Sequence, residues 1–263
     1  MSYKSNMKTM KNHYLILVLF CILSFKTNAQ DATTENPKWH YLAEAYLLFP
    51  NMEGTTGLGN LPDLPIDADS GDIFNNLKMG AMFYFEAHND KWAINTDFLY
   101  MNLNKEVQKD GKLINSGEVD MKQLGWELSG LYRINPWFEA GAGTRYIGLQ
   151  MDADINVNTL MGTEDKSKEI KESWIDPIII TRIKYPTQSK WIAELRSDIG
   201  GFGVGSDVTW QVQANVGYRF SKLFQTTVGY RWLDIDYESG TGEDRFLYDM
   251  MIFGSFVRLG FNF

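Results

Sequence analysis

Apolar side chains recur at every second residue through most of this chain. In residues 207–220 every even-numbered residue is apolar and every odd-numbered residue is polar or glycine. The same alternation runs through residues 124–134, 138–146, 175–185, 191–199, 224–232 and 253–263, and less cleanly through 39–48, 77–88 and 92–103. Successive side chains of a β-strand point to opposite faces, so each segment reads as a strand with one apolar face. The pattern predicts an all-β chain of about ten strands, each long enough to cross a bilayer at a tilt.

The connections between these segments distinguish a membrane barrel from a soluble sandwich. Residues 50–76, 104–116 and 153–173 are long connections, and 200–206 and 238–245 are intermediate. They alternate with short connections at residues 88–91, 135–137, 186–190 and 221–223. Bacterial transmembrane barrels have longer outer loops and short periplasmic turns. We therefore predict a transmembrane antiparallel up-and-down β-barrel of about ten strands, with eight or twelve as the alternatives.

The first 29 residues have the features of a secretory signal peptide. Lys8 and Lys11 precede an apolar run over residues 14–25, and Thr27 and Ala29 are the small residues before the expected cleavage site. The run is shorter than the ~20 residues of a membrane-spanning helix. Cys21 lies inside the run, so we do not expect a lipid anchor on it. We expect residues 1–29 to be removed and residues 30–263 to form a single barrel domain in the cell outer membrane.

Removal of residues 1–29 leaves a chain without cysteine and with an acidic balance. The mature chain has 21 basic and 33 acidic residues, a net charge of −12. No disulfide can form in it, and its charge disfavours a nucleic-acid partner. The partners that we expect are outer-membrane lipid, lipopolysaccharide and the barrel-assembly machinery, and we expect the barrel to be a monomer.

The chain ends on an aromatic residue within an alternating strand. Val257, Leu259, Phe261 and Phe263 share one face of this strand. Insertion machinery for such barrels reads the last strand, so we expect Phe261 and Phe263 to act as an assembly signal. Further aromatic residues beside the short connections predict an interfacial girdle. These are Trp39, Phe85, Trp92, Tyr132, Trp137, Phe138, Tyr185, Trp191, Phe220 and Phe224.

Two motifs rich in glycine and aromatic residues stand out, SDIGGFGVGSDVTW at residues 197–210 and VGYRWLDIDY at residues 228–237. Together with residues 72–80, 141–146, 174–177 and 216–219, they resemble a widespread group of Gram-negative outer-membrane β-barrel proteins. The resemblance covers most of the chain after residue 29. It implies a barrel fold and an outer-membrane location, and it assigns no catalytic residue.

The polar faces of the strands would line the barrel interior, and they carry charges of both signs. Strand parity directs inward the acids Glu44, Glu86, Asp97, Glu127, Glu139, Asp176, Glu194 and Asp198, and the bases Lys78, Arg133, Arg145, Arg182, Lys184, Arg196, Arg219, Arg231 and Arg258. About ten strands leave a narrow lumen. We expect an ion-paired network to fill it, with Arg145, Asp176, Arg182, Glu194, Arg196, Asp198, Arg219 and Arg231 as members. These features favour a structural or narrow-pore barrel.

Little in the sequence points to catalysis. Beyond residue 29 the histidines are His40 and His88, both beside short connections, whereas surface chemistry would need a base at the outer rim. Residues 67–72 lack the distal glutamate of a calcium loop, and residues 200–206 lack the helix that follows a phosphate-binding loop. We therefore expect no enzyme activity, catalytic residue, metal or cofactor. The alternative is an outer-membrane hydrolase or acyltransferase with its site at the outer rim.

Overall fold

The computed structural model describes residues 38–263 except 108–113, 160–161 and 186–188. The predicted signal peptide lies outside the described residues. The described elements are β1 (His40–Leu58), β2 (Leu64–Ala68), α2 (Ser70–Asn75), β3 (Leu77–His88), β4 (Trp92–Val107), β5 (Ile114–Asn135), β6 (Phe138–Thr159), β7 (Gly162–Lys184), β8 (Trp191–Gly201), β9 (Val208–Arg219), β10 (Phe224–Ser239), the 3-10 helix η1 (Gly242–Asp244) and β11 (Phe246–Asn262). In these ranges no helix has the length and apolar character needed to cross a membrane.

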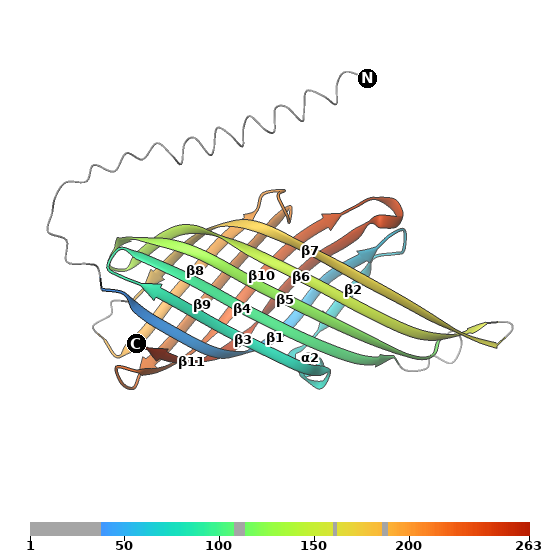
Figure 1. The fold of residues 1–263 in the computed structure, drawn as a ribbon, viewed down its shortest axis with the longest axis horizontal. Coiled ribbons are helices and arrows are strands. Elements are labelled where there is room, and N and C mark those ends of the chain that lie inside the picture. Colours follow the sequence, from blue (N-terminus) through green and yellow to red (C-terminus); the bar gives the residue numbers. More distant parts are fainter. Residues whose placement is uncertain (1–37, 108–113, 160–161, 186–188) are drawn as a thin grey trace, which may run out of the picture. The chain divides into compact units, whose positions relative to one another are not determined.

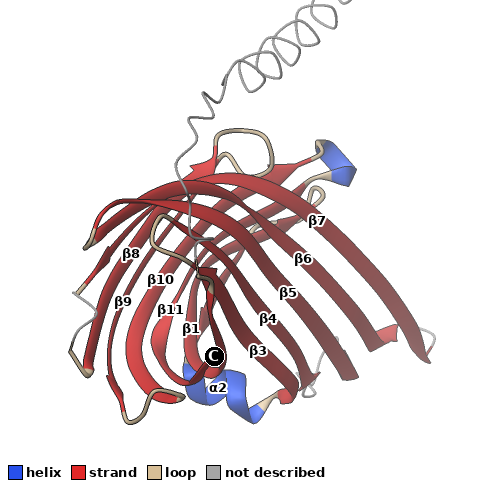
Figure 2. Ribbon diagram, turned by 60° about the vertical axis from the view of Figure 1, so that its left-hand side comes forward, coloured by secondary structure: helices blue, strands red, loops and turns tan. Residues whose placement is uncertain are grey.

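Ten of the strands form a closed antiparallel barrel (Figure 1). Each pairs with the next barrel strand in sequence, and β11 pairs back with β1 from Leu42↔Asn262 to Leu58↔Phe246. The short β2 pairs with the outer part of β1 and lies outside this circuit. Figure 2 shows that strands make up the whole wall. The predicted up-and-down barrel is therefore confirmed, with ten strands.

The outer wall carries a belt of apolar side chains. On β9, Val216 is 55% exposed while Gln211, Gln213 and Asn215 are buried in the interior. Ile179 on β7 and Phe83 on β3 are exposed in the same way. An apolar exterior over a polar interior is the reverse of a soluble protein and suits a wall in contact with lipid.

The bounds of all three predicted long connections are wrong, because strands continue into them. β1 extends to Leu58 before β2 and α2 follow, β4 extends to Val107, and β6 and β7 form a hairpin up to Thr159 and Gly162. Figure 1 shows this extension of β5, β6 and β7 in green and yellow. Outside the lipid belt neither face of a strand need be uniformly apolar, so the alternation that identifies strands in the wall fades although the backbone pairing continues.

The apolar side chains change faces at the outer limit of the belt. On β10, Val228 and Trp232 point outward, whereas Leu233, Ile235 and Tyr237 are buried in the interior. The register between β10 and β11 has no irregularity there, so the strand does not slip and only its surroundings change. Below this limit the wall is apolar outside, and its interior holds most of the buried charged groups together with smaller apolar clusters. Above it, water lies outside and an apolar core fills the interior.

Candidate functional site in the barrel interior

The outer end of the interior is filled by what we call the apolar layer. Its buried members are Met52, Ile73, Leu103, Ile147, Trp174, Leu233, Ile235, Tyr237, Phe246, Tyr248, Met250 and Ile252. The rings of Trp174 on β7 and Tyr237 on β10 stack at 3.8 Å between centroids, across the barrel from strands that do not pair. Burial of each large apolar side chain contributes roughly 1.5–3 kcal/mol. The layer therefore closes the lumen at this end with a packed core.

The short helix α2 adds Ile73 to the apolar layer. Asp69 precedes the helix, and its carboxylate accepts a hydrogen bond of 2.8 Å from the backbone N–H of Asp72, which caps the first turn. This turn directs Ile73 inward, where it is 4% exposed. The helix therefore contributes to the closure of the barrel.

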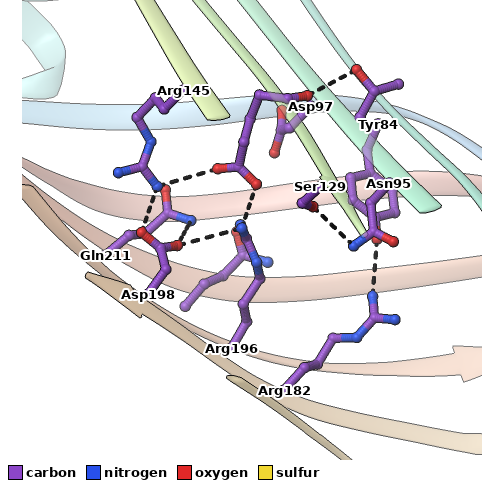
Figure 3. A network of polar contacts seen from close by, with 12 residues as sticks. Tyr84, Asn95, Asp97, Ser129, Arg145, Arg182, Arg196, Asp198 and Gln211 are labelled. Carbon is purple, nitrogen blue, oxygen red and sulfur yellow. Dashed lines mark hydrogen bonds and ion pairs between the residues drawn. The ribbon is translucent and has the colours of Figure 1, made fainter. Parts of the chain in front are cut away.

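Directly below the apolar layer lies the outer charge cluster, made of Glu127, Arg145, Arg196 and Asp198. Figure 3 labels Arg145, Arg196 and Asp198 of this cluster. Arg145 Nη2 lies 2.7 Å from Asp198 Oδ1 and 3.2 Å from Glu127 Oε2. Arg196 donates to Glu127 and lies 3.4 Å from Asp198 Oδ2. All four side chains are buried, so each charge depends on the others for compensation.

The inner charge cluster, towards the short turns, is centred on Arg182. Its Nε donates to Glu139 Oε2 at 2.7 Å, and its Nη1 donates to Glu86. Tyr84 Oη donates to Glu86 at 2.7 Å, and Lys184 Nζ donates to the other oxygen of Glu86 at 3.0 Å. Arg182 is 1% exposed. The cluster joins β3, β6 and β7 across the lumen.

A third group surrounds Arg258 of β11. Its guanidinium lies 3.3 Å from Glu44 Oε2 and 3.6 Å from Asp97 Oδ2. The carbon Cζ also lies 4.8 to 5.0 Å from the ring centroids of Tyr46, Tyr84 and Phe256, close enough for cation–π attraction. Arg231 reaches this group at 3.7 Å from Asp97 Oδ2.

Asp176 lies in the interior but outside the ion-paired clusters. Its carboxylate accepts hydrogen bonds from the backbone N–H and the hydroxyl of Ser206, at 2.6 and 2.9 Å, and from Trp174 Nε1 at 3.2 Å. Ser206 belongs to the connection between β8 and β9, which folds against β7. At Gly205 a Cβ atom would lie 2.6 Å from Asp176 Oδ1, so this close approach requires glycine. Asp176 therefore fixes an outer loop, and the expectation that it joins the charge network is wrong.

Two other residues expected in the charge network, Glu194 and Arg219, make weak or no ion pairs with described residues. Glu194 approaches Lys184 only to 3.9 Å, and Arg219 is half-buried at the short-turn end without an ion pair to any described residue. Parity predicts that Lys78 points inward, but a register shift between Leu77 and Met79 turns it outward, where it pairs with Asp120 at 3.0 Å.

The sequence reasoning missed the apolar layer and the inward rings of Tyr46, Tyr84 and Phe256. A signal for the layer exists. In residues 228–237 the apolar residues move from even to odd positions at Trp232, and β11 shows the matching change at Ile252 and Phe253. These two changes lie side by side, because Trp232 pairs with Phe253 and Leu233 with Ile252.

Little empty space remains between these groups. A void of about 50 Å³ lies between the apolar layer and the charge clusters, and a pocket of about 120 Å³ opens at the short-turn end. Within the described part of the chain, no group of three or more histidine, cysteine or acidic side chains could hold a metal ion. His40 and His88 stack at the short-turn end, with ring centroids 5.7 Å apart.

The closed sheet, its apolar belt and its filled interior define a transmembrane β-barrel. No protein-family model and no curated protein matches the chain. Among solved structures, the outer-membrane protease OmpT of Escherichia coli shares 9% identity at a TM-score of 0.45, covering 89% of this chain and 99% of its own. Ail, the attachment invasion locus protein of Yersinia pestis, shares 9% identity at 0.36, covering 86% and 98%. The Pseudomonas putida toluene transporter TodX shares 8% at 0.35, covering 88% and 91%. These similarities concern the fold alone.

Proposed function

We propose that this chain is an outer-membrane barrel protein whose lumen does not conduct, so that its role lies in the membrane wall and in the parts exposed outside the cell. The observation that carries the proposal is that apolar side chains and buried ion pairs together fill the lumen. An apolar core occupies the outer end, and below it buried ion pairs lie among further buried apolar side chains such as Leu48, Leu131 and Ile180.

The two fillings exclude solutes for different physical reasons. A hydrated ion that entered the apolar layer would lose its hydration shell without replacement. In the charge clusters, passage would require buried partners such as Arg182 and Glu139 to separate, and each separated charge costs several kcal/mol. The void of about 50 Å³ between the apolar layer and the charge clusters has about the volume of one or two water molecules.

The outer membrane is the location that this proposal requires. Its support is the apolar belt, the aromatic residues near the short turns and the predicted signal peptide. The short-turn end, with both ends of the barrel sheet, would face the periplasm, and the long strand extensions would face outward. Lipid, lipopolysaccharide and the assembly machinery remain the proposed partners of a monomeric barrel.

The described residues give the alternative of a hydrolase or acyltransferase no histidine at the outer rim. Both described histidines lie at the short-turn end, and the best-organised carboxylates in the interior are paired with arginine and buried. A buried, ion-paired carboxylate is a poor general base because it is inaccessible and its charge is already stabilised.

A solute-efflux assay tests the proposal. The protein refolded into vesicles loaded with a small sugar should retain the sugar as long as empty vesicles do, while vesicles with a general porin should lose it. Rapid efflux from vesicles that hold folded, heat-modifiable protein would overturn the blocked-lumen proposal.

A further inference from the structure

Strand β7 has a long edge without a neighbour. It pairs with β6 from Gly162 to Ile183, but β8 pairs with it only over the stretch from Ile178 to Lys184. The loop that carries Ser206 covers the next residues at Asp176. Beyond that, residues 163–174 have no strand on their far side in the described structure. This edge lies outside the lipid belt, in the extension seen in Figure 1.

The strand register shows which residues of β7 direct their backbone groups to this edge. The N–H of Lys184 donates to Trp137 on the β6 side, and the N–H of Tyr185 donates to Ala193 on the β8 side. Alternate residues of a strand point their backbone groups to alternate neighbours, and the β6–β7 register has no irregularity. Odd-numbered residues therefore face the edge. Ser167, Glu169, Lys171 and Ser173 present N–H and C=O groups there, and no described backbone group pairs with them.

The side chains along the edge form a sequence that is complementary to itself. Residues 167–173 read Ser-Lys-Glu-Ile-Lys-Glu-Ser. If a second copy runs antiparallel with Ile170 opposite Ile170, Glu169 faces Lys171, Lys168 faces Glu172 and Ser167 faces Ser173. Facing residues are on the same side of the sheet, because each pair has the same parity. Opposite charges in directly facing positions stabilise such a pair of strands, and like charges destabilise it.

The pattern also specifies the register. A slip of two residues in one direction places Glu169 opposite Glu169, and a slip in the other direction places Lys171 opposite Lys171. A slip of one residue would bring opposite faces together. In the central register the odd-numbered residues form the hydrogen-bonded pairs, so the unpaired backbone groups of both copies meet.

We propose that β7 pairs through this edge with β7 of a second copy of the chain, antiparallel about Ile170. The two-fold axis of such a pair is perpendicular to the sheet. In a barrel wall this axis reverses the direction of the barrel, so the two copies belong to facing membranes. The edge is thus a homotypic contact between membranes. This inference goes beyond the blocked lumen and requires only that the barrel is inserted.

Charge exchange tests the contact. Wild-type protein in vesicles should cluster them. Glu169→Lys should abolish clustering, because lysine then faces Lys171, and Lys171→Glu should abolish it because glutamate faces Glu169. When the two kinds of vesicle are mixed, the facing charges are opposite again and clustering should return. Glu106→Lys makes the same charge change on exposed β4, away from the edge, and should leave clustering unchanged.

A cysteine pair tests the register independently. The mature chain has no cysteine, and Ile170→Cys would bring two thiols to the two-fold axis, at a spacing that suits a disulfide. Oxidation should yield a covalent dimer between vesicles. Lys168→Cys, which faces Glu172, should yield none. Three results would each overturn the proposal. They are wild-type vesicles that stay dispersed, clustering of vesicles that carry only Glu169→Lys, and equal dimer yields from the two cysteine variants. Sugar retention is measured separately, so failure here does not affect the blocked lumen.

Discussion

Tyr41 and Phe263 exchange backbone hydrogen bonds of 2.8 and 2.9 Å, and their rings stack with centroids 5.6 Å apart. The last residue of the chain thus lies against the first strand of the barrel. Phe261 contacts Phe224 on the other side, at 5.6 Å between ring centroids. The two residues predicted to signal assembly are therefore part of the aromatic girdle at the point where the barrel closes.

Deletion of Phe263 should lower the fraction of protein that folds into membranes. The deletion removes the ring contact and both hydrogen bonds to Tyr41. The folded, heat-modifiable fraction on a gel measures the effect. Leu223→Ala, which truncates an exposed residue in a short turn, is the control and should fold like wild type. Equal folded fractions for wild type and the deletion would contradict the role of the terminal residue.

Arg182→Met should destabilise the barrel by about 3–5 kcal/mol, because it leaves the buried carboxylates of Glu86 and Glu139 without their main partner. Denaturant unfolding in detergent or lipid measures the change. Arg219→Met removes an arginine that makes no ion pair with a described residue, and it should change stability by no more than ~0.5 kcal/mol. Adding Glu139→Gln to Arg182→Met should recover part of the loss. Similar unfolding midpoints for the two arginine variants would show that the interior is hydrated.

Asp176→Ala should release the loop between β8 and β9. The change removes two hydrogen bonds to Ser206 and leaves the buried N–H of that residue unsatisfied, which costs roughly 1–3 kcal/mol locally. Cleavage by an added protease within residues 202–207 should become faster. Asp207→Asn, a change at a neighbouring exposed carboxylate, should leave the cleavage rate near that of wild type. A loop equally resistant in both variants would argue against this anchoring.

Acid should loosen the outer connection held by Arg245. Its guanidinium donates to both oxygens of Asp63, at 2.7 and 3.2 Å, and these hydrogen bonds hold the pKa of Asp63 below its usual value of 3.8. A lowered carboxyl pKa stabilises the folded form above the usual pKa, and this contribution is lost as the pH falls through the lowered pKa.

Hydrogen exchange at the Gly59 amide reports on this connection, because that amide donates to the backbone oxygen of Arg245 at 2.7 Å. Its protection should be constant from neutral pH down to about pH 5 and should decline below about pH 4. Asp63→Asn should reduce the protection of the Gly59 amide at neutral pH and remove its acid dependence. Asp67→Asn should leave the protection and its acid dependence as in wild type. An unchanged profile in Asp63→Asn would contradict the prediction.

The sequence predicts the wall of this barrel well and its outer extensions poorly. The starts of β3 at Leu77, β8 at Trp191 and β10 at Phe224 agree with the alternation, because a strand between lipid and a polar interior must alternate. β6 and β7 continue up to residues 159 and 162 among charged residues such as Lys168 and Glu169. There, backbone pairing persists while the contrast between the two faces fades.

Except at Lys78, beyond the register shift, parity could predict which charges point inward, but not which of them meet. Arg145 on β6 contacts Asp198 on β8, two strands away, so the contact depends on the stagger of the wall. Asp176 has the same inward parity, yet it binds Ser206, because a loop folds over that end of β7. Parity alone does not predict the apolar layer, whereas the change of phase at Trp232 marks the limit of the lipid belt.

Single-channel recording in a planar bilayer tests the blocked lumen most directly. With the apolar layer and both charge clusters in place, wild-type protein confirmed as folded should add no steady conductance steps to the bilayer at moderate voltage. Removing the charge of Arg182 should at most produce brief, noisy openings, because the apolar layer still closes the outer end. Steady steps of the size of a general porin from the wild-type protein would contradict the blocked lumen.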